Sequence, residues 1–295
     1  VEILKEGGGK QTHSLKLRDS TGIEYTLRSV NKDPEPLVPK IAKSLGLENI
    51  VIDGISAQHP YGSILAAELA ERAGVIHTSP RLVFLPNQKK LENFNEVFGN
   101  SLFLLEYETK SETNWTDFEN IVEIIDTDNL QELKLERGDK LRIDKSALIR
   151  ARLFDMLIGD WDRHTKQFGW AIQNKNGSLK ALPISGDRDN AFFKNGGLIP
   201  RLLSNKNVLP RMRPYDKKIS FMEGLVYPFD RYFLLNTELR LFIREAEYLQ
   251  QTLNDATINS SLKVWPDEIS LLDGQDIIRK LKSRRTNIIE YAKQF

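Results

Sequence analysis

The first thirty residues alternate between apolar and polar side chains, the period typical of β-strands. Alternation is clear over residues 14–18 and again over residues 23–30, and the turn sequence Ser-Thr-Gly at 20–22 separates the two. Alternating segments on either side of a turn predict a hairpin within an antiparallel sheet. Three prolines between residues 34 and 39 then end the strand pattern.

Two later segments carry apolar residues at helical spacing. Residues 63–73 form the first pattern, which stops at Gly74, and residues 147–158 form a stronger one, which follows Asp144 and stops at Gly159. Aspartate is common just before a helix and glycine just after one. We therefore expect a helix in each segment.

Shorter patterns predict the remaining elements. The expected strands are residues 82–85, 101–107, 168–172 and 179–184. The polar residues 110–119 are typical of a loop, and helices are expected at 237–252 and 273–294. Because the N-terminal third is mostly strand and the remainder mostly helix, we expect an α+β fold of two lobes, residues 1–105 and residues 106–295.

Composition and charge narrow the class of protein. The chain has 295 residues, of which 40% are hydrophobic and 28% charged, as in an ordinary globular protein. Its 42 Lys and Arg against 41 Asp and Glu leave a net charge of +1, so nucleic acid is not expected as a partner. The absence of cysteine excludes disulfides, thiolate zinc sites and a cysteine nucleophile. No apolar run reaches the roughly 20 residues of a spanning helix, so no transmembrane segment is expected.

The densest polar sequence follows the second predicted helix. Residues 159–167 read Gly-Asp-Trp-Asp-Arg-His-Thr-Lys-Gln, and residues 185–192 read Ser-Gly-Asp-Arg-Asp-Asn-Ala-Phe. Carboxylates brought together repel unless a cation or a proton lies between them, and Mg²⁺ binds one or two carboxylates together with waters and phosphates. A further carboxylate beside the metal could orient or deprotonate an attacking hydroxyl. The alternative is that these residues are helix caps and surface ion pairs.

Residues 157–164, with Gln167, resemble the catalytic loop of atypical protein kinases: the HipA toxins, the spore-coat CotH kinases and the secretory-pathway casein kinases of the Golgi. Their loop reads approximately Leu-Ile-Gly-Asn-x-Asp-Arg-His-x-x-Asn. Residues 187–192 resemble their metal-binding segment, Asp-x-Asp-x-x-Phe in the CotH group. The whole chain is also similar to a domain of Bacteroidetes proteins found beside calcineurin-like phosphoesterases or outer-membrane barrels. The resemblance implies a two-lobed, atypical protein-kinase-like fold with a β-rich N-lobe and a mainly α-helical C-lobe.

The resemblance also implies roles for residues of the C-lobe. Asp162 is expected to be the catalytic aspartate, and Asp187 to hold the metal that bridges the nucleotide phosphates. Gln167 stands where the relatives have a metal-binding Asn. Asp189 is expected to be a second metal ligand or a structural acceptor for Arg163. The implied cofactors are ATP and Mg²⁺ or Mn²⁺, because phosphoryl transfer needs mainly positioning and charge neutralisation.

A glycine-rich sequence lies where the N-lobe of such an enzyme covers the phosphates. Gly7, Gly8 and Gly9 separate two predicted strands. Glycines let backbone N–H groups approach phosphate oxygens, so these residues are expected to bind nucleotide. Three glycines between strands also form plain hairpin loops, which remains the alternative.

The third predicted strand of the N-lobe should supply a cation to the phosphates. Arg28 stands at this position, and Lys16 on the preceding strand is the alternative. On the predicted helix 63–73, Glu71 or Glu68 is expected to pair with that cation. Both glutamates could equally be solvated charges on a helix face.

These features predict ATP- and metal-dependent phosphoryl transfer to a hydroxyl of a protein, glycan or small molecule. Arg28, Gln167 and Asp160 depart from the family pattern, and Arg and Lys are not interchangeable at a phosphate. A pseudokinase that serves as a binding or scaffolding module is therefore an alternative. A second alternative is a phosphoesterase whose two metals are held by Asp160, Asp162, His164, Asp187 and Asp189.

Two further expectations concern the surroundings of the site. Residues 201–213 hold four basic residues among prolines and form either a substrate-facing loop or a solvated one. The chain begins at Val1 rather than Met, so we expect a trimmed protein or an excised domain. Together with the absence of cysteine and the resemblance to outer-membrane-linked domains, this favours the periplasm or the cell envelope.

Overall fold

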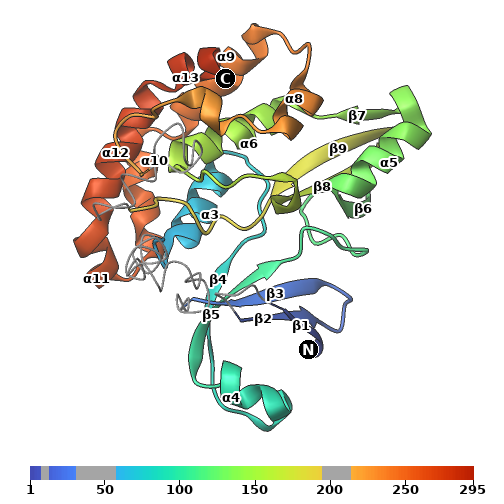
Figure 1. The fold of residues 1–295 in the computed structure, drawn as a ribbon, viewed down its shortest axis with the longest axis vertical. Coiled ribbons are helices and arrows are strands. Elements are labelled where there is room, and N and C mark those ends of the chain that lie inside the picture. The colour runs from blue at the N-terminus through green and yellow to red at the C-terminus, as the bar shows by residue number, and fades with distance from the viewer. Residues whose placement is uncertain (8–12, 31–57, 195–213) are drawn as a thin grey trace, which may run out of the picture.

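The computed structural model describes residues 1–7, 13–30, 58–194 and 214–295, which form two β-sheets and a helical region (Figure 1). One sheet lies at the bottom of the view and the other at the upper right, while the C-terminal helices pack at the left. The α+β class and the two-lobed arrangement expected from the sequence are confirmed.

The first sheet is antiparallel, and its five strands have the order β1-β2-β3-β5-β4. Its strands are β1 (Glu2–Gly7), β2 (Ser14–Arg18), β3 (Glu24–Ser29), β4 (Arg81–Leu85) and β5 (Ser101–Tyr107). The predicted hairpin is confirmed as β2 and β3, in which Leu15 lies opposite Leu27. Both leucines are buried in the core of this sheet. Because side chains alternate along a strand, Thr26 and Arg28 lie on the opposite face, toward the rest of the protein.

The second sheet has four strands in the order β6-β8-β9-β7. Its strands are β6 (Ile121–Asp126), β7 (Leu141–Ile143), β8 (Phe168–Lys175) and β9 (Ser178–Ser185). The two short strands expected near 168 and 184 are confirmed as the hairpin β8-β9, which turns at Asn176 and Gly177 with positive φ at both. The edge strands were not predicted, because β7 has only three residues and β6 carries two acidic residues among its apolar ones.

Ten helices occur in the described parts of the chain. They are α3 (Gly62–Arg72), α4 (Asn95–Phe98), α5 (Thr127–Arg137), α6 (Lys145–Ile158), α8 (Pro228–Leu234), α9 (Leu239–Thr252), α10 (Asp255–Ser261), α11 (Asp267–Ile269), α12 (Gln275–Thr286) and α13 (Ile288–Gln294). The short 3-10 and π turns are η2 (Lys89–Phe94), η3 (Gly138–Lys140), η4 (Thr165–Gln167), η5 (Met222–Leu225), η6 (Leu262–Val264) and η7 (Ser270–Gly274). The helix expected at 273–294 is divided at Asn287 into α12 and α13. None of the described helices is both long and apolar enough to span a membrane.

Helix α6 runs through the main hydrophobic core and has the ends that the sequence predicts. The Asp144 carboxylate accepts a hydrogen bond from the Ala147 N–H at 3.0 Å, and Gly159 ends the helix with a φ of 73°. Phe154 and Leu157 of α6 are fully buried in the same core as Leu69 of α3. Helix α3 therefore packs on the C-terminal helices, although it lies between two strands of the first sheet in sequence.

Two charged residues of α6, Arg152 and Asp155, are also fully buried. Asp155 accepts hydrogen bonds from Arg152 at 3.1 Å, from Arg163 at 3.2 Å and from Arg188 at 3.1 Å. Burial alone would raise the pKa of Asp155, but the three guanidinium groups lower it, so the carboxylate is charged. Arg152 also donates to Asp230 of α8 at 2.8 Å. Arg152, Arg163 and Arg188 thus form an arginine cluster around Asp155. It joins α6 to the two polar sequences, residues 159–167 and residues 185–192.

Asp155→Asn should strongly destabilise the fold. The change removes the charge that three buried guanidinium groups share, and breaking a buried ion pair by removing one partner costs about 3–5 kcal/mol. Urea titration followed by circular dichroism would measure this loss in the free energy of unfolding. Asp139→Asn is the control, because that carboxylate is exposed and forms no ion pair with the described residues. Equal stability of the two variants would contradict the structural role of Asp155.

Candidate active site

A cleft of about 150 Å³ lies between the first sheet and the end of the hairpin β8-β9. Its lining includes Arg28 of β3, Glu106 of β5, and Gln167 and Asp187 from the two polar sequences. Arg28 and Asp187 are 159 positions apart in the chain and form an ion pair here. The fold thus brings together residues that the sequence singled out separately.

Arg28 lines this cleft and contacts three carboxylates. Its Nη2 donates to Oε1 of Glu106 at 2.8 Å, and its Nη1 pairs with Asp187 and lies 3.5 Å from Oδ2 of Asp189. Burial alone would lower the pKa of Arg28, but these carboxylates raise it. The guanidinium group is therefore a fixed positive charge at the cleft.

Glu106 is the partner that orients Arg28 from the neighbouring strand. Its side chain is buried, and its Oε2 accepts a hydrogen bond from the hydroxyl of Thr78 at 2.6 Å. Burial raises the pKa of Glu106 to about 7, although Arg28 opposes the shift. No sequence motif predicts a role for Glu106. Its only signal was a single carboxylate within the apolar run Leu-Phe-Leu-Leu-Glu-Tyr of the strand.

The expected partner of Arg28 on helix α3 is not observed. Glu68 instead accepts hydrogen bonds from Arg72, one turn along the same helix, at 2.9 Å. Glu71 lies with its Oε2 3.5 Å from Nε2 of His77. The pairing expectation is therefore corrected: Glu106 of β5 holds the cation, because the helix directs both of its glutamates elsewhere.

Asp187 follows β9 in a tight, positive-φ conformation, with a φ of 51°. Arg163 fixes this turn, since its Nη1 donates to the carbonyl oxygens of Gly186 at 2.7 Å and of Asp187 at 3.2 Å. The same guanidinium group binds Asp155. No hydrogen bond joins Arg163 to Asp189 among the described residues, so the acceptors of Arg163 are Asp155, Asp160 and backbone carbonyls.

Gln167 provides a test of whether the cleft fits a metal ion. Its side chain is buried, its Nε2 lies 3.5 Å from Oδ2 of Asp187, and its Oε1 has no hydrogen-bond partner. A buried amide oxygen without a partner is costly, and carboxylate and amide oxygens are ligands that hard divalent ions accept. Rotation of the amide group would turn this oxygen toward Asp187. The two residues therefore fit an oxygen-ligated divalent cation.

Asp162 lies in the loop between α6 and η4 and is partly exposed. The backbone on either side is fixed, because the hydroxyl of Tyr227 donates to the carbonyl of Trp161 at 3.0 Å and Arg163 is fully buried. Within the described part of the chain, the Asp162 carboxylate has no hydrogen-bond or ion-pair partner. A held but unpartnered carboxylate can accept the proton of a hydroxyl.

Lys16 and Gly7, the other described N-lobe residues predicted to bind nucleotide, do not line the cleft. Lys16 lies on the same face of the sheet as Thr26, its neighbour across the strands, but pairs with Glu24 at 2.7 Å. Gly7 is the last residue of β1. Two further predicted features lie outside the described residues: the pair Gly8 and Gly9, and the basic segment 201–213.

Asp160, which stands where the similar catalytic loops have Asn, is buried. Its Oδ2 lies 3.3 Å from Nη1 of Arg163, and its Oδ1 has no hydrogen-bond partner. Burial raises the pKa of Asp160 to about 8, although Arg163 opposes the shift. The carboxyl group is therefore mostly neutral at pH 7, as the amide of Asn would be.

Comparison with known proteins finds solved structures of limited similarity and no matching sequence. No family model and no curated protein matches the chain. The proinflammatory kinase CtkA of Helicobacter pylori is 14% identical, with a TM-score of 0.49 over 95% of this chain and 93% of CtkA. HipA of Shewanella oneidensis, solved with HipB and operator DNA, is also 14% identical, with a TM-score of 0.41 over 99% of this chain and 67% of HipA. At this level of similarity neither structure identifies the reaction of this chain.

Asp160→Asn should flatten the dependence of stability on pH. The folded state keeps the Asp160 proton up to about pH 8, whereas the unfolded chain releases it near 3.8. Between these values the folded state binds more protons, so the free energy of unfolding falls as the pH rises. The amide does not titrate and should lose less stability between pH 5 and pH 8.5 in urea titrations. A loss as large as that of the wild type would contradict the buried, protonated state of Asp160.

Proposed function

We propose that this chain is a kinase-like phosphotransferase that uses ATP with Mg²⁺ or Mn²⁺ and acts on a hydroxyl of a protein, glycan or small molecule. One observation carries the proposal: Arg28, Gln167 and Asp187 meet in a single cleft, and Asp162 lies in the loop that leads to Gln167. This set supplies a cation for phosphates, two oxygen ligands for a metal and a proton acceptor, the groups that phosphoryl transfer requires.

Arg28 is the proposed phosphate-binding cation. Its planar guanidinium group has several N–H donors and binds two partners at once, as it does here with Glu106 and Asp187. Glu106 would keep one edge of the guanidinium in place while the other edge binds phosphate oxygens. Because Glu106 and Arg28 lie on adjacent strands of one sheet, this pair does not depend on the position of a helix.

Asp187 and Gln167 are the proposed metal ligands. A bound Mg²⁺ or Mn²⁺ would neutralise the negative charge of the phosphates. The described residues hold no group of three or more His, Asp or Glu placed to bind a metal. Two protein ligands nevertheless suffice for a magnesium ion that arrives with nucleotide, since phosphate oxygens and waters complete its shell.

Asp162 is the proposed catalytic residue. Its carboxylate would accept a hydrogen bond from the acceptor hydroxyl, orient that oxygen toward the terminal phosphate and take its proton. Arg163 and the hydroxyl of Tyr227 would hold the loop in place during this step. Proton transfer to a positioned carboxylate contributes roughly 10²–10⁴-fold to a rate.

A pseudokinase that serves as a scaffold is the second candidate, and one observation favours it. Arg28 pairs directly with Asp187, the same carboxylate that would bind the metal. In an active enzyme, nucleotide and metal must replace this ion pair. In a scaffold, the ion pair would stay and hold the cleft together.

Asp187→Ala and Asp162→Ala should separate binding from transfer. The first should abolish the rise in melting temperature that ATP and Mg²⁺ give together, because the metal loses its carboxylate. The second should keep this rise and reduce the formation of ADP from ATP by about 10²–10⁴-fold. Asp139→Asn is the control for both measurements. An unchanged thermal shift in Asp187→Ala would refute the metal site, and absence of any shift in the wild type would favour the scaffold.

Arg28→Ala should weaken ATP binding, whereas Lys16→Ala should not. Arg28 lines the cleft, whereas Lys16 forms an ion pair with Glu24. We expect the dissociation constant of ATP to rise by about tenfold or more in Arg28→Ala, the loss of one charge-assisted contact. Titration with a fluorescent ATP analogue would measure it. If Lys16→Ala weakened ATP binding and Arg28→Ala did not, the phosphate contact would be assigned to Lys16.

A further inference from the structure

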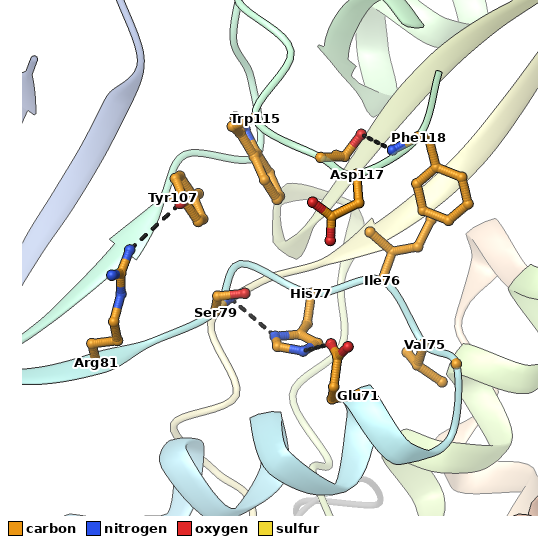
Figure 2. Close-up of a pocket in the computed structure, with 12 residues that line it drawn as sticks. Glu71, Val75, Ile76, His77, Ser79, Arg81, Tyr107, Trp115, Asp117 and Phe118 are labelled. Atoms are coloured by element: carbon orange, nitrogen blue, oxygen red, sulfur yellow. Dashed lines mark hydrogen bonds and ion pairs between the residues drawn. The ribbon is translucent and has the colours of Figure 1, made fainter. Parts of the chain in front are cut away.

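A second cavity, of about 490 Å³, lies beside the cleft (Figure 2). Its lining comes from the C-terminal end of α3, the segment that joins α3 to β4, the first residue of β4, the last residue of β5 and the loop after β5. None of the proposed catalytic or metal-binding residues lines this cavity, although Tyr107 lines both the cavity and the cleft.

Two carboxylates give the cavity a negative charge. Figure 2 shows Asp117 and Glu71 directed toward the same space from opposite sides. Within the described part of the chain, the Asp117 carboxylate has no hydrogen-bond or ion-pair partner, and the Glu71 carboxylate has His77 as its only one. Both residues are exposed to solvent at the cavity, so an incoming ligand can reach them.

His77 does not neutralise Glu71. Its Nδ1 accepts a hydrogen bond from the backbone N–H of Ser79 at 3.0 Å, so the ring proton is on Nε2, which faces Glu71. Burial lowers the pKa of His77 to about 3, and Arg188 adds to the shift. Arg81, the cation at the edge of the cavity, is directed toward the hydroxyl of Tyr107 at 3.4 Å. The charge of the two carboxylates is thus only partly compensated.

Aromatic and aliphatic side chains form the other walls. Trp115 stacks on Tyr107 with ring centroids 4.6 Å apart, and its indole N–H donates to the carbonyl of Glu108 at 3.0 Å. Phe118, whose side chain is 41% exposed, lies beside Ile76 on the opposite wall. Aromatic rings attract cations, and apolar walls can pack against the methylene stem of a long basic side chain.

We propose that this cavity binds an arginine side chain of a protein partner, with the guanidinium group between Asp117 and Glu71 and its stem against Phe118 and Ile76. A planar guanidinium group can pair with a carboxylate and stack on an aromatic ring at the same time. The proposal goes beyond the phosphotransferase function and does not depend on it, since it involves neither nucleotide nor metal.

The test uses the complete protein and three peptides. The first is an uncharged Gly/Ser peptide with three arginines, the second has citrulline at the same positions, and the third is its lysine counterpart. Calorimetry should show binding of the arginine peptide, weaker binding of the lysine peptide and none of the citrulline peptide, which has the shape of arginine without its charge. Asp187→Ala should bind the arginine peptide as the wild type does, whether or not the cleft binds ATP.

The double variant Glu71→Gln/Asp117→Asn should lose affinity for the arginine peptide by about tenfold or more, because both carboxylates become neutral. The control is Glu136→Gln/Glu268→Gln, which removes two exposed carboxylates elsewhere, on α5 and α11. It should bind as the wild type does. Equal affinity of the two double variants would overturn the proposal. So would no binding by the wild type at about 1 mM peptide, or equal binding of the citrulline peptide.

Discussion

The Asp155 carboxylate, buried in α6 and bound by three arginines, is the constraint on which the site depends. Charges so far from water are stable only when each is paired, so the positions of Arg152, Arg163 and Arg188 are fixed together. Arg163, held in place by Asp155, donates to the carbonyl oxygens of Gly186 and Asp187 and so fixes the backbone of both residues. A helix of the core thereby sets the geometry of the loop that carries the proposed metal ligand.

The arginine cluster also explains how the polar residues around the candidate site can be buried. Arg163 follows α6, and Arg188 lies beyond β9, yet both donate to the same carboxylate. Each packs over an aromatic ring as well, Arg163 over Phe168 and Arg188 over Phe154. Stacking and charge pairing together compensate for the loss of water around these groups. The loops are thus rigid without a regular secondary structure of their own.

Local sequence patterns predicted the elements whose stability is local, and missed those that depend on distant contacts. Alternation identified the hairpin β2-β3, and a cap with a terminal glycine identified α6. The short strand β7 exists only because it pairs with β9, which no local pattern reveals. The same holds for the site. The resemblance to the kinase metal-binding segment singled out Asp187, but the Glu106 that orients Arg28 is one carboxylate in an apolar strand. Only the register of the sheet brings Glu106 to Arg28.

The segment that joins α3 to β4 lies between the two cavities, and Tyr107 at the end of β5 lines both. His77 and Ser79 line the second cavity, whereas Thr78 between them lines the cleft and donates to Glu106. A ligand that shifts this segment from one side therefore changes the support of Arg28 on the other. Thermodynamic linkage makes such an effect reciprocal: if a bound partner changes the affinity for nucleotide, nucleotide must change the affinity for the partner by the same factor.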